Sequence, residues 1–162
     1  MLFSKSFGYA LRGLLYVAVM QGEKERIQLN EIAQELDVPR HFMGKILKRM
    51  AKENLLDSSR GTNGGFSMNQ KTLSVSLLSI VEITDGLSTF KNCVLRLHEC
   101  DRQNPCPMHP KVEDIKNSLQ NWLSNTTVHD LILNDSHDFI KSITTNNIPV
   151  SNTYLTPLKK YS

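Results

Sequence analysis

Apolar residues in the first third of the chain recur with helical spacing in three consecutive segments. Residues 6–20 are apolar nearly all round, which is typical of a buried helix. Residues 29–36 have a single apolar face and predict a shorter helix. The turn at residues 37–39 ends in a proline, which suits the first turn of a following helix because its missing N–H is not needed there. A third helix is therefore expected over residues 39–54.

This third helix is expected to have two different faces. The apolar face consists of Phe42, Ile46, Leu47 and Met50. The other face is basic and consists of His41, Lys45, Lys48 and Lys52. Such a helix would pack on the core with one side and present cations to solvent with the other.

A glycine-rich turn follows the third helix. It lies at residues 61–65, between two short runs with strand character at residues 55–60 and 66–68. This arrangement predicts a β-hairpin. Glycines on both sides of Thr62 and Asn63 would let the hairpin tip approach another molecule closely, and Arg60 stands directly before the tip.

The second half of the chain predicts three more helices. Residues 76–84 form the first, which ends at a Gly at position 86. Residues 107–123 form a longer helix with an apolar seam in steps of four and three, as in helices that pair. The seam includes Val112, Ile115, Leu119 and Trp122. Thr127 has an acid three residues on and predicts the start of a last short helix. Residues 144–162 have no period and are expected to be extended or mobile.

Composition and charge narrow the class of protein. The 162 residues suffice for one domain with an appendage, and 40% hydrophobic with 22% charged residues excludes a disordered chain. No apolar run is long enough to span a bilayer and the first residues do not predict a signal peptide, so we expect a cytoplasmic protein. The net charge is +3, yet residues 40–60 hold six basic and two acidic residues. This basic stripe indicates a surface that faces a polyanion.

Two helices joined by a tight turn, the second with a basic face, and then a hairpin predict a winged helix-turn-helix. The expected fold class is mostly α with a small β-hairpin wing and a long dimerisation helix. We expect a DNA-binding domain over residues 1–86, the cysteine segment and dimerisation helix over 87–143, and a tail over 144–162. The recognition helix would enter the major groove and Arg60 a narrow groove. The alternatives are a helical hairpin with a solvated lysine face and a protein-interaction module.

All three cysteines lie in one short window that ends at a histidine. The spacing is Cys-x6-Cys-x5-Cys-x2-His, formed by Cys93, Cys100, Cys106 and His109. In the cytosol, clustered thiols favour metal binding or redox chemistry over disulfides. Thiolates suit an iron–sulfur cluster or zinc, and His109 is the nearest fourth donor. The long gaps favour a loop around a cluster, while zinc and metal-free thiols stay open as alternatives.

Three stretches resemble a known family. They are SFGYALRGLLYVAV, LNEIAQELDVPRHFMGKILKRMAKENLLDSSRGTNGGF and SLLSIVEITDG. Over about residues 1–135 the chain resembles the Rrf family of bacterial winged-helix regulators. The resemblance implies a homodimer on a palindromic operator, joined by the long helix after the cysteines. It also implies DNA contacts from the N-terminal residues, the recognition helix and the wing, which are Ser4, Lys5, Pro39, Arg40, His41, Lys45, Lys48 and Arg60. Gly44 stands where IscR-like members have an acidic residue that tunes base preference, so a different operator is expected.

The resemblance extends to the cysteine window. IscR-like members hold a 2Fe–2S cluster with three cysteines and a histidine just after the third, which Cys93, Cys100, Cys106 and His109 match, although the first gap is longer here. NsrR-like members use an Asp near the N-terminus, where this chain has Gly8. A 2Fe–2S cluster is therefore implied over 4Fe–4S. Members without a cluster also keep a Cys-Pro-x-His-Pro run, so a regulator that senses through thiols, zinc or a partner molecule is the alternative.

No catalytic function is expected. Cys100 with His98 or His109 lacks an orienting carboxylate and an oxyanion hole. The glycine-rich turn at 61–65 lacks the Lys-Ser/Thr of a phosphate-binding loop. The sequence therefore predicts a dimeric DNA-binding regulator whose operator binding is modulated by a cysteine-ligated iron–sulfur cluster.

Overall fold

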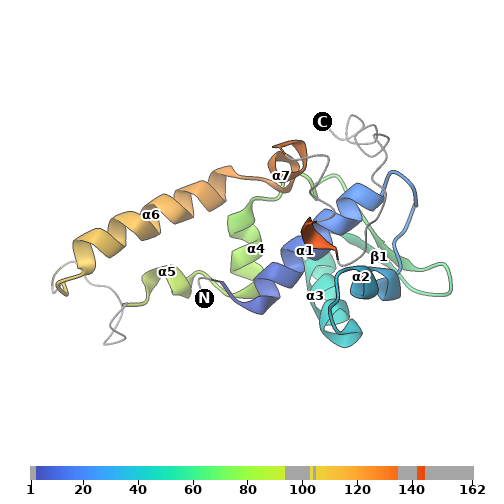
Figure 1. Cartoon of the computed structure of the whole chain (residues 1–162), viewed down its shortest axis with the longest axis horizontal. Helices are drawn as coiled ribbons and strands as arrows, with labels where there is room; N and C mark the ends of the chain where they lie inside the picture. The colour runs from blue at the N-terminus through green and yellow to red at the C-terminus, as the bar shows by residue number, and fades with distance from the viewer. Residues whose placement is uncertain (1–2, 94–102, 104, 135–141, 145–162) are drawn as a thin grey trace.

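The computed structural model describes residues 3–93, 103, 105–134 and 142–144. The elements run in the order α1 (Lys5–Met20), α2 (Leu29–Glu35), α3 (Arg40–Lys52), β1 (Asp57–Ser59), β2 (Gly65–Ser67), α4 (Leu77–Thr84), α5 (Ser88–Lys91), α6 (His109–Asn125) and α7 (Val128–Asn134) (Figure 1). The expected fold class, mostly helical with a small hairpin wing, is confirmed. In this part of the chain no helix has both the length and the apolar character that crossing a membrane requires.

Helix α1 is the centre of the core. Ala10, Leu14 and Val17 are fully buried in it, and α3 and α4 both pack against it. Ser4 caps its start, because its Oγ accepts the backbone N–H of Phe7 at 3.2 Å. The nearly all-apolar pattern of residues 6–20 therefore predicted a buried helix correctly. The observed helix begins one residue earlier, at Lys5.

Helices α2 and α3 form the helix-turn-helix. The chain reverses at Asp37, whose φ of +49° is in the left-handed region, and Val38 is buried beneath the turn. Pro39 precedes α3 as its N-cap residue and does not lie in the first turn. The expected start of the recognition helix was therefore one residue early.

The wing is a two-stranded antiparallel hairpin in which Ser58 pairs with Phe66. Ile27 extends it, since the N–H of each of Ile27 and Phe66 donates to the other's carbonyl at 2.9 Å. Position 64 has no room for a side chain, because a Cβ there would lie 2.5 Å from the carbonyl oxygen of Ser59. A glycine is therefore required. The sequence predicted the hairpin but not the edge contributed by Ile27, which comes from the loop before α2.

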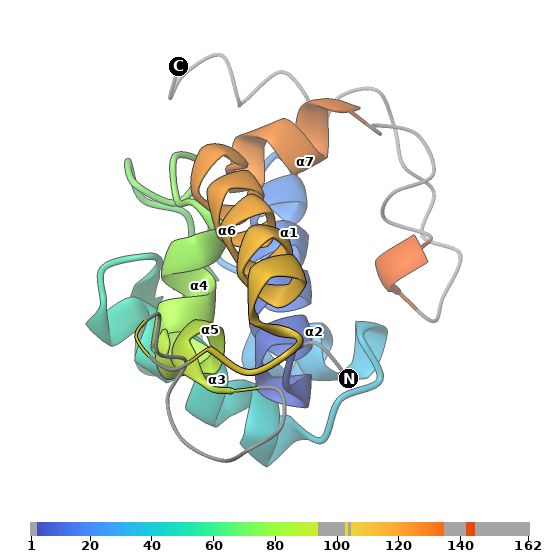
Figure 2. The same cartoon turned by 90° about the vertical axis from the view of Figure 1, so that its left-hand side faces the viewer.

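The second half of the chain starts against the same core and then leaves it. α4 begins after Ser76 and ends at Thr84, and Gly86, whose φ is +75°, follows its C-cap residue Asp85. The C-terminal end of α6 packs on α4, and the helix projects away from the helix-turn-helix (Figure 1). Figure 2 views α6 nearly along its length. The helix begins at His109, two residues later than expected, because residues 107 and 108 form a turn.

The start of α7 has the capping box that the sequence predicted. The carboxylate Oδ2 of Asp130 accepts the backbone N–H of Thr127 at 2.8 Å and its hydroxyl at 2.7 Å. In return the Thr127 Oγ accepts the backbone N–H of Asp130 at 3.2 Å. These hydrogen bonds favour the charged carboxylate, so the pKa of Asp130 is lower than usual, mainly because of the Thr127 hydroxyl.

Candidate nucleic-acid interface

Helix α3 presents a basic ridge on the side that faces away from the core. Met43, Leu47 and Met50 are fully buried on its inner side. The ridge consists of exposed His41, Lys45, Lys48 and Lys52. It spans eleven residue steps, or about 16 Å at the helical rise. The expected basic face is therefore confirmed as a solvent-facing surface that is long enough to lie in a DNA groove.

The predicted apolar face of α3 was partly wrong, because the buried side of the helix is rotated from the predicted one. Phe42 is 50% exposed and Ile46 is half-buried, while Met43 and Gly44 take the inner positions. Gly44 explains the difference, because a Cβ there would lie 2.9 Å from Cδ2 of Leu29. The close approach of α2 to this glycine sets which side of α3 faces inward.

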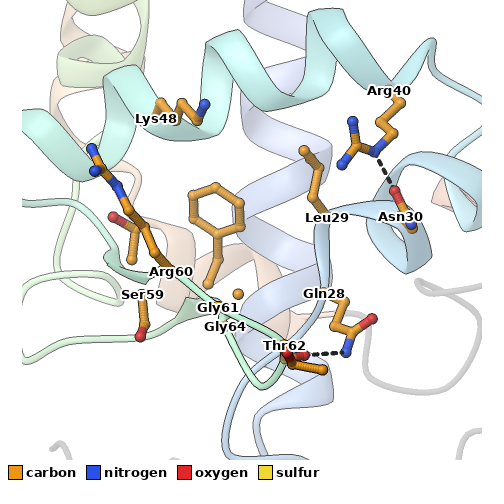
Figure 3. A pocket seen from close by; sticks show the side chains of 13 residues that line it. Gln28, Leu29, Asn30, Arg40, Lys48, Ser59, Arg60, Gly61, Thr62 and Gly64 are labelled. Atoms are coloured by element: carbon orange, nitrogen blue, oxygen red, sulfur yellow. Dashed lines mark hydrogen bonds between the residues drawn. The ribbon is translucent and has the colours of Figure 1, made fainter.

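A concave groove of about 660 Å³ lies between α3, the start of α2 and the wing. Arg40 and Lys48 enter it from α3, and Arg60 from the wing (Figure 3). Its described lining contains no Asp or Glu. Concentrated positive charge in a concave surface attracts polyanions more strongly than the same charges spread over a flat one. We call this surface the wing groove.

Two hydrogen bonds tie the sides of the wing groove together. Arg40 Nε donates to Oδ1 of Asn30 at the start of α2. Gln28 Nε2 donates to the carbonyl of Thr62 at 3.4 Å, which links the loop before α2 to the wing tip (Figure 3). Neither Asn30 nor Gln28 was predicted from the sequence, because no helical or strand period indicates that the start of α2 lies beside the wing.

The remaining residues expected at the DNA differ in what they contact. Pro39, Lys5, Thr62 and Asn63 are exposed. Ser4 is already engaged within the chain, because its N–H donates to Asp85 Oδ2 at 2.9 Å and its hydroxyl donates to Oδ1 at 2.5 Å. This contact fixes the start of α1 to the end of α4, so a phosphate contact by the Ser4 hydroxyl would compete with Asp85.

The expected metal ligands lie only partly within the described residues. Cys93 and His109 are buried and Cys106 is half-buried, whereas Cys100 lies outside the described residues. In the part of the chain that the structure describes, no three His, Cys, Asp or Glu side chains come together to hold a metal. His109 Nε2 lies 3.3 Å from Oε2 of Glu113, one turn along α6. Two thiols and an imidazole at the two ends of one segment are suitable donors for an iron–sulfur cluster, so the donor chemistry fits.

Helix α6 leaves part of its expected seam uncovered. Ile115 is 67% exposed and Trp122 is 52% exposed, while Val112 is half-buried. Leu119 is half-buried because it packs on the core of its own chain. Leu123, which was not among the expected seam residues, is fully buried there. The seam thus serves intrachain packing at Leu119 and leaves an apolar stripe at Ile115 and Trp122.

Comparison with known proteins decides the family. The profile of the Rrf2 family, described as an iron-dependent transcriptional regulator, matches residues 3–134. The chain belongs to the Rrf2 family. A protein of Aquifex aeolicus (strain VF5), assigned as an HTH-type transcriptional regulator, is 31% identical over 142 residues, which are 86% of this chain and 97% of that one. The resemblance inferred from the wing and recognition helix is therefore confirmed.

Two further proteins are similar to this Rrf2 chain, one in sequence and one in fold. The HTH-type transcriptional regulator IscR of Escherichia coli O1:K1 / APEC is 23% identical over 126 residues, 78% of this chain and 76% of IscR. The structure of CymR, titled the global cysteine regulator of B. subtilis, has the same fold with a TM-score of 0.68 at 19% identity. It covers 83% of this chain and 98% of CymR. The Rrf2 chain is a DNA-binding transcriptional regulator and not an enzyme.

Proposed function

We propose that this Rrf2 regulator is a homodimer that binds a palindromic operator with α3 in the major groove and the wing beside the backbone. The observation that carries the proposal is the wing groove, where Arg40, Lys48 and Arg60 converge without a described acid. His41, Lys45 and Lys48 would reach base edges or phosphates from the ridge. Lys5, Pro39, Thr62 and Asn63 are exposed around it and would add backbone contacts. Two such heads, one per protomer, would read two half-sites.

Selection of bound duplexes from a random pool tests this proposal. We expect the enriched sequences to form an inverted repeat with one half-site for each protomer. Lys48→Ala should weaken binding to the selected duplex, since it removes a cation of the ridge. Lys71→Ala is the matched control, because Lys71 is exposed but belongs neither to α3 nor to the lining of the wing groove. Enrichment of no sequence, or equal loss in the two variants, would disprove this arrangement.

We propose in addition that Cys93, Cys100, Cys106 and His109 hold an iron–sulfur cluster, of the 2Fe–2S type, that modulates operator binding. A bound cluster would supply a redox-sensitive tie between the end of α5 and the start of α6. The chain's own contacts support a connection from this segment to the DNA-binding head. Lys116 on α6 donates to the carbonyl of Asn92, the neighbour of Cys93. At the other side of α5, Asp85 holds the start of α1 through Ser4.

Protein purified without oxygen or chelator tests the cluster proposal. Iron and acid-labile sulfide should copurify with it, with visible absorption that is lost in Cys106→Ala. At fixed salt, cluster-loaded and cluster-free protein should differ in operator affinity, because a ligand shifts a conformational equilibrium only by its different affinity for the two states. Equal operator affinity of the cluster-loaded and cluster-free forms would show that the cluster does not regulate DNA binding.

A second candidate is a family member that regulates without a cluster. The contact between His109 and Glu113 favours it, because Nε2 of the imidazole faces a carboxylate of its own helix at 3.3 Å. In this case the segment would sense through its thiols, zinc or a partner molecule. Colourless protein without iron or sulfide that still binds the selected operator would support this candidate, a zinc assay would separate zinc from bare thiols, and the DNA-binding proposal would stand unchanged.

A further inference from the structure

A second groove, of about 410 Å³, lies on the opposite side of α3 from the wing. Its walls come from the start of α1, from α3 and from the end of α4, the three helices that pack together at the base of the DNA-binding head. We call it the α1–α3 groove. The volume is within the range of small-molecule sites, roughly 300–1,000 Å³. It shares Lys45 with the basic ridge and no residue with the described lining of the wing groove.

The floor of the α1–α3 groove is apolar. Tyr9 lies on the α1 side and Ile46 on the α3 side, and both are half-buried. Met50 is fully buried below them. Phe42 stands at 50% exposure at the same face of α3, with its ring centroid 4.1 Å from that of His41. Phe42 therefore adds exposed apolar surface beside the hollow that a ligand could cover.

The rim of the α1–α3 groove is cationic. Lys5, Lys45 and Arg49 line it, and its described lining contains no Asp or Glu. Asp85 directly follows Thr84 of the lining, but its carboxylate accepts the N–H and hydroxyl of Ser4. DNA phosphates would match these cations but have no apolar body to cover Tyr9, Ile46 and Phe42. An apolar floor with a positive rim is complementary to a molecule that has an apolar body and one negative charge.

We propose that the α1–α3 groove binds a small amphipathic anion, such as an aliphatic or aromatic carboxylate, and that this ligand displaces DNA. The apolar body would lie over Tyr9, Ile46 and Met50, and the carboxylate would lie between Lys45 and Arg49. Lys45 belongs both to this groove and to the basic ridge. A bound anion would neutralise it and occupy the space beside α3 that a DNA backbone needs. The ligand site stands on its own geometry, while the displacement of DNA rests on the function proposed above.

Titration of the full-length protein with two matched probes tests the site itself. Decanoate has the required charge, and decyltrimethylammonium has the same apolar chain with the opposite charge. We expect saturable binding of decanoate, with shifts of the nuclear magnetic resonance signals of Tyr9, Ile46 and Thr84. Decyltrimethylammonium should bind at least about tenfold more weakly, since it replaces a charge-assisted contact with the cationic rim by repulsion between like charges. Absence of saturable decanoate binding, or equal binding of both probes, would overturn the proposal.

Two variants and one control locate the bound probe. Arg49→Gln should weaken decanoate binding about fivefold by removing one rim charge, and Ile46→Ala should weaken both probes by removing apolar surface. Arg26→Gln is the control, because it makes the same change at an arginine that lines neither groove. Signal shifts at Ile115 and Trp122 in place of Tyr9 and Ile46 would assign the binding to the stripe on α6 and overturn the proposal.

Competition with the selected operator tests the regulatory part. Decanoate should lower operator occupancy at fixed salt, and the same concentration of decyltrimethylammonium should not. If decanoate binds but operator affinity does not change, the ligand site stands and the proposed displacement of DNA is wrong. If no operator can be selected while decanoate still binds Tyr9 and Ile46, the proposed function fails and the ligand site stands.

Discussion

At the scale of single residues, the interface combines two kinds of cation. Arg60 is held at the edge of the wing groove, where a guanidinium can enter a narrow DNA groove. Lys52 lies at the last turn of α3 and is exposed, which suits a phosphate contact at most. The two residues therefore should differ in how their removal affects sequence preference.

Arg60→Ala should weaken operator binding by about 1–3 kcal/mol and reduce the preference for the operator over unrelated duplexes. Lys52→Ala should weaken binding equally on both, with the slope of log affinity against log salt falling by about one. Titrations of each variant on both duplexes at several salt concentrations measure this. Unchanged affinity and preference in Arg60→Ala would remove the wing from the interface.

Glycine positions allow a matched test of the wing. Gly64→Ala should destabilise the protein by about 1–3 kcal/mol, because the new Cβ would lie 2.5 Å from a backbone oxygen that cannot move aside. Gly8→Ala makes the same change in α1, where no atom lies within 4 Å of the added Cβ. It should be neutral or stabilise by up to about 1 kcal/mol. Denaturant unfolding of the two variants measures the difference, and equal effects would contradict the tight wing turn.

At the scale of elements, features set by local sequence signals were predictable, whereas features set by contacts between distant elements were not. The capping box at Thr127 was predictable because both partners lie within one turn of chain. The inward face of α3 was not, because Leu29 from α2 settles against Gly44 and selects it. The wing hairpin was predicted from its glycines, while the pairing of Ile27 with Phe66 joins residues far apart in sequence. The basic ridge was found because it is a periodic pattern on one helix.

The capping box makes the stability of α7 depend on pH. The pKa of Asp130 is lowered by the hydroxyl and backbone N–H of Thr127, so its stabilising effect is complete above the pKa of the unfolded chain. That effect is lost as pH falls through the lower pKa of the folded state. Asp130→Asn should therefore be less stable than the wild type near neutral pH, and the difference should shrink towards acidic pH. Thermal unfolding of both proteins across this range measures it, and a constant difference would show that the carboxylate charge is not involved.

At the scale of the whole molecule, α6 carries the contacts from the cysteine segment to the DNA-binding head and also an uncovered apolar stripe. Its C-terminal half is held by α4 and by fully buried Leu123. Ile115 and Trp122 lie seven residues apart, which places them on one side of the helix, and both are more than half exposed. A large exposed apolar pair on a helix is typical of an interface, here between two protomers in the proposed dimer. This arrangement would set the spacing of the two heads on the operator.

The single tryptophan makes the dimer directly measurable. In the proposed dimer Trp122 is covered by the partner, so its fluorescence should shift to longer wavelength in Ile115→Asp, and this variant should sediment as a monomer. Operator affinity should then fall by at least about tenfold, because the two heads no longer bind as one bivalent unit. Asn117→Asp adds the same charge at an exposed position on another side of α6 and should leave both properties unchanged. A wild-type protein that sediments as a monomer would assign this stripe to a different partner and leave each DNA-binding head to act alone. Ile115→Asp protein that remains dimeric would place the dimer interface elsewhere.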